Sequence, residues 1–206
     1  MVNKIRYAVK RHLGLKKVKV GHAGTLDPLA TGLLIIAIGR ATKKIDEVAG
    51  LPKEYTGHFV MGATTPSFDL ETEIDQTFDV SSLTEEALKI AAQNMQGEVL
   101  QTPPIFSAKK IDGTRAYEMA RKGKEVEMRK HLVNIHEFEI SKVEMPNVYF
   151  RVFCSKGTYI RSIANDFGKA LNNGAYLGSL RRTKIGDFKV EDAQTIEQFL
   201  ASLNDQ

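Results

Sequence analysis

The sequence predicts an α+β fold with a mixed, largely antiparallel central sheet flanked by helices. Segments with the two-residue period of strands and segments with the 3.6-residue period of helices both occur along the 206 residues. They do not alternate strictly, as the βαβ units of a parallel sheet would. With 42% hydrophobic residues, a chain of this length can bury a full core, so we expect one compact domain over residues 1–206.

The N-terminal elements are predicted to be a helix followed by two strands. Apolar residues from Val2 to Leu13 follow helical spacing, and Gly14 is placed to end that helix. The unbroken apolar run Leu33–Ile38 is typical of a buried strand. Large side chains alternate over Tyr55–Met61, which predicts a second strand.

A helix and an insertion are predicted next. Thr84 is a good helix N-cap, and Gly97 is placed to close the helix that follows. The segment from Thr102 to His131 has little core periodicity and many charges. We expect it to project from the sheet as an insertion rather than to form a separate domain.

The C-terminal third predicts two strands and two helices. Every second residue of Val148–Cys154 is apolar, which indicates a strand, and the apolar spacing of Ile160–Phe167 indicates a helix. A last strand is expected near Leu180–Ile185. The final helix begins at a capping box formed by Thr195 and Gln198.

Composition limits the function classes. The net charge is +4, and residues 1–20 carry seven basic side chains and no acidic one. Residues 104–131 carry eight basic and four acidic side chains. Two basic segments in a small chain favour a phosphate-bearing partner. The lone Cys154, the lack of an apolar run of membrane-spanning length and the lack of a secretory signal favour a cytoplasmic protein.

Several chemistries are excluded by missing motifs. The sequence has no dinucleotide-binding or P-loop glycine pattern after a strand and no Gly-x-Ser-x-Gly elbow. Its five histidines and single cysteine show no metal-ligand spacing, so no metal site is expected. A loop over Gly21–Gly32 stands out instead, because it holds His22 and Asp27 five positions apart between turn-forming glycines. An aspartate can attack an electrophilic carbon without any cofactor.

This loop, Gly-His-Ala-Gly-Thr-Leu-Asp-Pro-Leu-Ala-Thr-Gly, closely resembles the catalytic segment of the TruB family of tRNA pseudouridine-55 synthases. Further segments resemble the family's other motifs in the family's order, and together they cover nearly the whole chain. They are Gly39–Lys43, Lys53–Tyr55, Gly62–Thr65 with Asp69, Gln101–Lys109, Gly113–Tyr117, Ser155–Arg161 and Leu180–Thr183. The resemblance implies the pseudouridine synthase fold, with a thumb insertion at about residues 102–131.

The resemblance also implies the reaction. Uridine 55 in the T loop of tRNA is isomerised to pseudouridine after the base is flipped out of its stack. The bond from ribose C1′ to N1 of uracil breaks, the base turns, and C1′ joins C5. Nothing is oxidised and no group leaves for good, so no cofactor is expected. Asp27 stands where the family has its nucleophile; whether its carboxylate adds to the sugar, stabilises a cationic sugar or removes the C2′ proton stays open.

Roles for other residues follow from the same resemblance. Arg161 matches the arginine that pairs with the catalytic carboxylate, and Tyr159 matches an active-site tyrosine that could transfer a proton. Tyr55 matches the residue on which the target base stacks, His22 the one that fills the vacated place, and Leu180 a wall of the uracil pocket. Contacts with RNA phosphates are implied for Lys43 and for the thumb residues Lys109, Lys110, Arg115 and Arg121.

Two departures from the family pattern are expected to matter. We expect the chain to lack the family's Lys-Pro-x-Gly-x-Thr-Ser segment before the first helix and the small C-terminal RNA-binding domain that many relatives carry. Affinity for the T stem-loop of tRNA would then depend on the catalytic domain and thumb, acting as a monomer.

Two alternatives stay open at this point. The first is a non-catalytic RNA-binding or RNA-folding module on the same scaffold, although such a module has no need for Asp27, Tyr159 and Arg161 together. The second is a hydrolase of a small substrate with an aspartate nucleophile, which the basic thumb and the lack of a water-activating partner disfavour.

Overall fold

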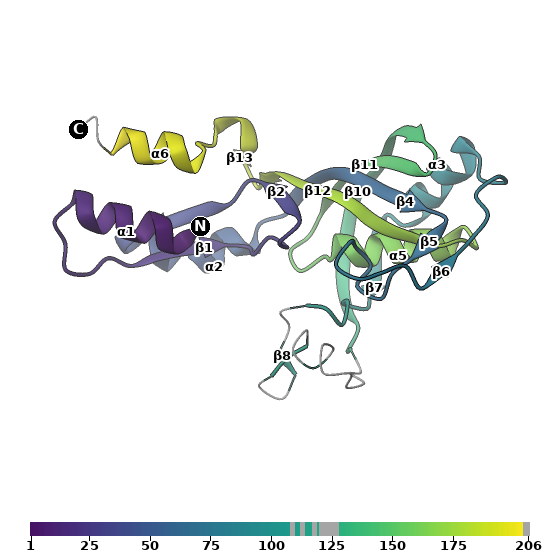
Figure 1. The fold of residues 1–206 in the computed structure, drawn as a ribbon, viewed down its shortest axis with the longest axis horizontal. Helices are drawn as coiled ribbons and strands as arrows, with labels where there is room; N and C mark the ends of the chain where they lie inside the picture. The colour runs from purple at the N-terminus through teal and green to yellow at the C-terminus, as the bar shows by residue number, and fades with distance from the viewer. Residues whose placement is uncertain (108–109, 112–113, 117–118, 120–127, 204–206) are drawn as a thin grey trace. The chain divides into compact units, whose positions relative to one another are not determined.

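The computed structural model describes residues 1–107, 110–111, 114–116, 119 and 128–203 (Figure 1). The chain divides into two compact units. The first consists of Met1–Lys53 and Arg181–Gln206, and the second of Glu54–Leu180. The expectation of a single catalytic domain stays a prediction, and each unit is described by itself below.

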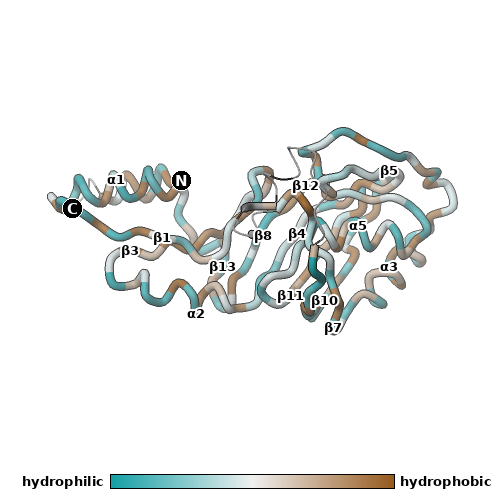
Figure 2. Tube along the Cα trace, turned by 90° about the horizontal axis from the view of Figure 1, so that it is seen from below, coloured by the Kyte–Doolittle hydropathy of each residue, from teal (hydrophilic) through white to brown (hydrophobic). Residues whose placement is uncertain are grey.

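The first unit is built on a two-stranded antiparallel ladder. Strand β1 pairs with β3, with Val20 opposite Ile38 and Ala23 opposite Ile35. Helix α1 bears both hydrophilic and apolar residues (Figure 2), and its apolar stripe buries Ile5 and Val9 against Val20. The elements of this unit are α1 (Val2–His12), β1 (Val20–Ala23), β2 (Ala30–Gly32), β3 (Ile35–Ile38), η1 (Gly39–Lys44), α2 (Ile45–Gly50), β13 (Phe188–Lys189), η2 (Val190–Asp192) and α6 (Ile196–Ser202).

The second unit is built on a sheet in which the strands follow the order β12, β4, β11, β10 and β7. Strand β10 pairs antiparallel with both β11 and β7, so the mixed, mostly antiparallel α+β architecture is confirmed. Its elements are β4 (Lys53–Met61), β5 (Ala63–Thr64), β6 (Gln76–Thr77), α3 (Glu85–Asn94), β7 (Gly97–Gln101), β8 (Lys110–Ile111), β9 (Thr114–Arg115), β10 (His131–Glu144), β11 (Asn147–Cys154), α5 (Ile160–Ala170) and β12 (Ala175–Ile185), the last of which continues into the first unit's residues.

Aromatic side chains fill the space between this sheet and its helices. Phe59 of β4 stacks on Phe150 of β11, with ring centroids 4.2 Å apart. Phe167 of α5 contacts both Phe59 and Phe138 at centroid distances of 5.6 and 5.5 Å. All four rings are at most 3% exposed. A core of this kind fixes α5 relative to the sheet, because close-packed rings leave little freedom.

The helix signals in the sequence are confirmed at residue level. The Thr84 hydroxyl accepts a hydrogen bond from the Ala87 amide at 3.2 Å, which caps α3. Thr195 and Gln198 form both bonds of the predicted capping box at the start of α6. Gly14 follows α1 with a φ of 61°, a conformation that glycine adopts without strain.

The strands differ from expectation in several places: β1, β2 and β7 were not predicted, and β12 begins at Ala175 rather than near Leu180. Strand β3 begins at Ile35 rather than at Leu33, because the Leu33 amide bonds instead to the carbonyl of Arg182 at 2.8 Å. The 14-residue strand β10 was not predicted at all. Its pairing with β11 is irregular between Ile135 and Glu137 and again after Ile140, so its apolar side chains lose the strict two-residue period.

Candidate active site

Asp27 lies in a loop that leaves the end of β1 and returns to β3. The chain turns at this residue, because the Ala30 amide donates to the Asp27 carbonyl at 2.9 Å, and the side chain is half-buried. The short strand β2 follows at once and pairs with β12. The loop is therefore tied at both sides, which suits a carboxylate that must keep one position.

The two ends of this loop are joined by the side chain of Arg182, and we call this contact the joint of the loop. The sequence predicted no role for Arg182. Its guanidinium donates to the Gly24 carbonyl at 2.9 Å and to the Leu33 carbonyl at 2.8 Å. The side chain is only 1% exposed. A signal was present, because Arg182 occupies a position of β12 two residues from the apolar Leu180, where an inward-facing side chain is expected.

His22 and Lys43 belong to the same unit as Asp27. His22 lies on β1 opposite Ile36, and its Nδ1 atom is buried without a hydrogen-bond partner among the described residues. Lys43 is exposed at the end of η1. A groove of about 610 Å³ in this unit is lined by basic and neutral side chains only. They are Arg6, Lys10, Lys16, Lys17, Val18, Lys19, Val20, Gly21, Thr42 and Ile45.

In the second unit, Arg161 lies in the first turn of α5 and is 4% exposed. Its Nη1 atom donates to the Phe106 carbonyl at 2.8 Å and lies 3.5 Å from a carboxylate oxygen of Asp69. The Asp69 carboxylate also accepts a bond from the Glu71 amide at 2.9 Å. The chain thus keeps a guanidinium in a nearly dry site by surrounding it with oxygen acceptors.

Tyr159 caps the same helix and is held by a buried amide. The Tyr159 amide donates to Oε1 of Gln101 at 2.8 Å, and Nε2 of Gln101 donates back to the Tyr159 carbonyl at 3.1 Å. Gln101 is 1% exposed. The rings of Tyr159 and His131 are nearly perpendicular, with centroids 6.0 Å apart, and His131 in turn donates to the Gly157 carbonyl at 3.0 Å.

Tyr55 and Leu180 lie on the neighbouring strands β4 and β12 of the second unit, and each is 9% exposed. Of the thumb residues, Lys110 and Arg115 are paired positions of the β8–β9 hairpin. Lys109 and Arg121 lie outside the described residues. The second unit thus contains Tyr55, Tyr159, Arg161 and Leu180, while the first holds Asp27, His22 and Lys43.

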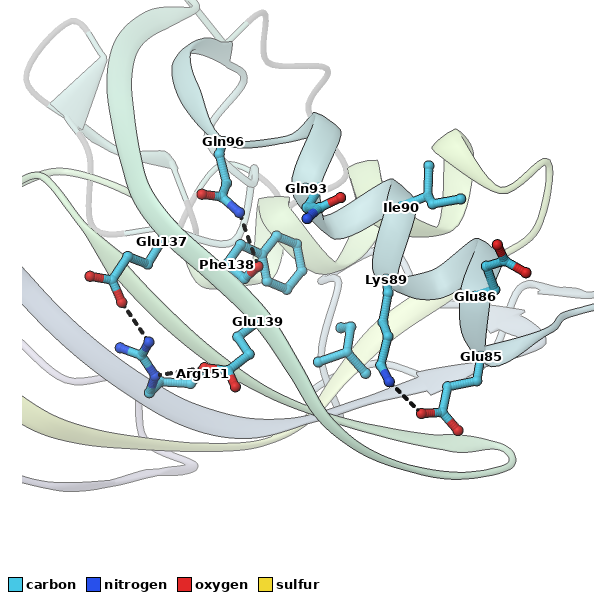
Figure 3. A pocket seen from close by; sticks show the side chains of 11 residues that line it. Glu85, Glu86, Lys89, Ile90, Gln93, Gln96, Glu137, Phe138, Glu139 and Arg151 are labelled. Atoms are coloured by element: carbon cyan, nitrogen blue, oxygen red, sulfur yellow. Dashed lines mark hydrogen bonds and ion pairs between the residues drawn. The ribbon is translucent and has the colours of Figure 1, made fainter.

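Another groove of the second unit, of about 800 Å³, contains none of the predicted site residues. Figure 3 shows it between α3 and β10. Its two cations are already paired, Lys89 with Glu85 and Arg151 with Glu137 and Glu139 (Figure 3). The hydrogen bonds that Arg151 donates to these carboxylates, the one to Glu137 above all, raise its pKa above the ordinary value. A groove rimmed by carboxylates repels phosphates, which makes it a poor site for RNA.

Metal-binding clusters and membrane-spanning helices are both missing from the described residues. No three His, Cys, Asp or Glu side chains in that part of the chain are grouped so that they could hold a metal ion. No helix there combines the length and the apolar character needed to cross a membrane.

Comparison with known proteins identifies the family. Residues 10–160 match the family model described as TruB family pseudouridylate synthase (N terminal domain), and residues 161–206 match that of the tRNA pseudouridylate synthase B C-terminal domain. The chain is 57% identical over 203 residues to a Flavobacterium johnsoniae protein named tRNA pseudouridine synthase B, covering 98% of this chain and 89% of that protein. It is 52% identical over 206 residues to a Phocaeicola vulgatus protein of the same name, covering 100% of this chain and 88% of that protein.

Solved structures support the same assignment. A chain in the crystal structure of a Cbf5–Nop10–Gar1 complex superposes with a TM-score of 0.71 at 27% identity. The match covers 96% of this chain and 49% of that one, so the chain spans about half of that neighbour's length. With the family models covering residues 10–206 and whole-length relatives at about half identity, this chain belongs to the TruB family of pseudouridylate synthases, which are isomerases.

Proposed function

We propose that this chain converts uridine 55 in the T loop of tRNA to pseudouridine, with Asp27 as the nucleophile. The observation that carries the proposal is the chain's membership of this family. The Gly21–Gly32 loop contains a single aspartate, Asp27, which lies in a turn, and hydrogen bonds from Arg182 hold the loop in place. The relatives named tRNA pseudouridine synthase B supply the substrate class.

In this mechanism the Asp27 carboxylate attacks C1′ of the flipped nucleotide. The C1′–N1 bond breaks, and its electron pair leaves with the uracil ring. The ring turns, C5 attacks C1′, and the carboxylate departs. The Tyr159 hydroxyl takes the proton that C5 loses and gives up its own proton, N1 gains one proton, and no oxidant is required. Arg161 serves this site by keeping the carboxylate ionised.

The remaining residues bind the RNA. Tyr55 stacks on the target base, Leu180 walls its pocket, and His22 occupies the place from which the base was flipped. His22 lies on β1 in the same unit as Asp27, which supports this role. Lys43 contacts a phosphate, as do the thumb residues.

Replacing Asp27 tests the chemistry. Asp27→Asn keeps the shape of the side chain and removes its charge, so we expect isomerisation to fall by at least about four orders of magnitude while tRNA binding stays largely intact. Tritium release from tRNA labelled at C5 of uridine measures the first quantity, and filter binding the second. Asp46→Asn, an exposed aspartate of α2 in the same unit, is the matched control. Activity retained by Asp27→Asn would exclude the nucleophile, and unmodified tRNA left unchanged by the parent protein would favour a module that only binds RNA.

The thumb is tested by salt dependence. Neutralising Lys109 and Lys110 with glutamine is expected to weaken tRNA binding. It should also flatten the plot of log affinity against log salt by about one unit for each phosphate that the variant no longer neutralises. Lys89→Gln is the control, because Lys89 is an exposed lysine already paired with Glu85. An unchanged slope in the double variant means that the thumb does not bind phosphates.

We further propose that the protein acts as a monomer in the cytoplasm. The sequence holds one cysteine, the buried Cys154, so no disulfide can form within the chain, which suits a reducing compartment. Light scattering of the purified protein with and without tRNA measures the number of copies, and a dimer in either state contradicts the proposal.

A further inference from the structure

The loop that carries Asp27 runs from Gly24 to Leu33, and one buried guanidinium bonds to both of these ends, which we call the neck of the loop. Strands β1 and β3 pair as far as Ala23 opposite Ile35, and the loop emerges between these residues. Nε of Arg182 donates to the Leu33 carbonyl at 2.8 Å on one side of the neck. Nη2 of the same side chain donates to the Gly24 carbonyl at 2.9 Å on the other side.

The main chain of Arg182 also touches this loop. The Leu33 amide donates to the Arg182 carbonyl at 2.8 Å. A Cβ atom added to Gly32 would lie 2.2 Å from that carbonyl oxygen, so only glycine allows the two chains to approach this closely. A Cβ added to Gly24, whose φ is 80°, would lie 3.2 Å from Nη1 of Arg182. At both positions, therefore, the absence of a side chain makes room for Arg182.

The energetics favour a positioning role over a surface role. Arg182 is 1% exposed, and burying a charged group is unfavourable unless its donors are bonded. A rigid planar fork loses little freedom when it bonds two carbonyls, and it fixes the distance between them. The loop between those carbonyls includes two glycines, which would otherwise give it wide conformational freedom.

We propose that Arg182 is a positioning residue that sets the place of the Asp27 carboxylate by holding Gly24 and Leu33 together. This proposal rests on the proposed function of Asp27 for its kinetic consequence, although the structural part stands without it. A lysine at this position keeps the charge but offers a single ammonium in place of the fork. It cannot hold both carbonyls in the same geometry.

Hydrogen exchange tests the structural part independently of catalysis. In Arg182→Lys, the amides between Gly24 and Leu33 are expected to exchange at least about tenfold faster than in the parent protein. Those of α5 in the other unit should exchange at the parent rate. Arg181→Lys is the matched control, because Arg181 is the exposed neighbour on the same strand. An unchanged loop, or acceleration spread evenly over the chain, overturns the proposal.

Single-turnover kinetics tests the functional part. With enzyme in excess over labelled tRNA, Arg182→Lys is expected to slow pseudouridine formation on the order of 10- to 100-fold, the effect of small misplacements of a reacting group. The dissociation constant for tRNA should change less than about twofold, since Arg182 is buried within the protein. A parent rate in the folded variant, or a rate loss matched by an equal loss of binding, overturns the positioning role.

A second variant covers the case in which Arg182→Lys does not fold. Gly24→Ala disturbs the same joint from the loop side, so it should accelerate exchange in the loop and slow turnover without removing any charge. Parent-like exchange and turnover in Gly24→Ala then decide against the proposal. An active Asp27→Asn protein removes the proposed function but leaves the exchange result standing, so the two failures are distinguishable.

Discussion

The buried pair formed by Arg161 and Asp69 gives a prediction whose size follows from the structure. The side chains are 5% and 9% exposed, and Nη1 lies 3.5 Å from the carboxylate oxygen. At that distance, and with the effective dielectric constant of about 20 that suits protein sites, the attraction is about 5 kcal/mol. Removing the arginine therefore leaves a buried carboxylate that keeps the hydrogen bond from the Glu71 amide but loses its cation.

We expect Arg161→Met to lower the free energy of unfolding by about 3–5 kcal/mol, the usual loss when one partner of a buried pair is removed. Asp69→Asn keeps an oxygen that the Glu71 amide can reach, so its loss should be smaller, about 1–3 kcal/mol. Both changes remove the same interaction. The loss in the free energy of unfolding of the double variant should therefore be about 2 kcal/mol smaller than the sum of the losses of the two single variants.

Equilibrium unfolding in urea, followed by far-ultraviolet circular dichroism, measures all four proteins of this cycle. The exposed pair Glu85 and Lys89, whose side chains are 59% and 56% exposed, is the matched control. Its coupling energy should not exceed about 0.5 kcal/mol. A coupling energy for Arg161 and Asp69 as small as that of the control would refute the reasoning, because it would show that burial does not strengthen this pair.

Two other predictions concern stability alone. Burial raises the pKa of Asp166 above its ordinary 3.8, although Lys169, Asn165 and Lys130 oppose the shift. Between pH 3.8 and the raised pKa of the folded state, the folded protein therefore binds more protons than the unfolded chain. Its free energy of unfolding falls as the pH rises through that window. Asp166→Asn should raise the melting temperature at pH 7 and lose this advantage at and below about pH 3.8; an equal advantage at both pH values contradicts the assignment. Gly57→Ala places a Cβ 2.1 Å from the Ser179 carbonyl oxygen, so urea unfolding should show a loss of about 1–3 kcal/mol. Gly50→Ala, where nothing lies within 4 Å of the added atom, is the control, and an equal effect in both variants would show that the close approach at Gly57 is tolerated.

Local signals in the sequence were sufficient for the helices α1, α3, α5 and α6, whereas α2 and the 3-10 segments η1 and η2 were not predicted. The cap at Thr84, the capping box at Thr195 and the stop at Gly14 depend on residues within three or four positions of one another. Interactions of such short range can be predicted from the sequence, because each capping side chain bonds to a backbone amide in the adjoining turn of its own helix. The motif around Asp27 likewise identified the family, which the family models confirm.

Tertiary structure decided where the site residues are held. Gln101 bonds the backbone of Tyr159 across 58 positions, and Arg182 reaches Gly24 across 158. No local pattern specifies which buried polar group will satisfy another so far along the chain, since that depends on how the strands pair. Strand β10 could not be predicted for the same reason. Its pairing with β11 is irregular, so its apolar residues follow the partner strand and do not repeat every second position along the sequence.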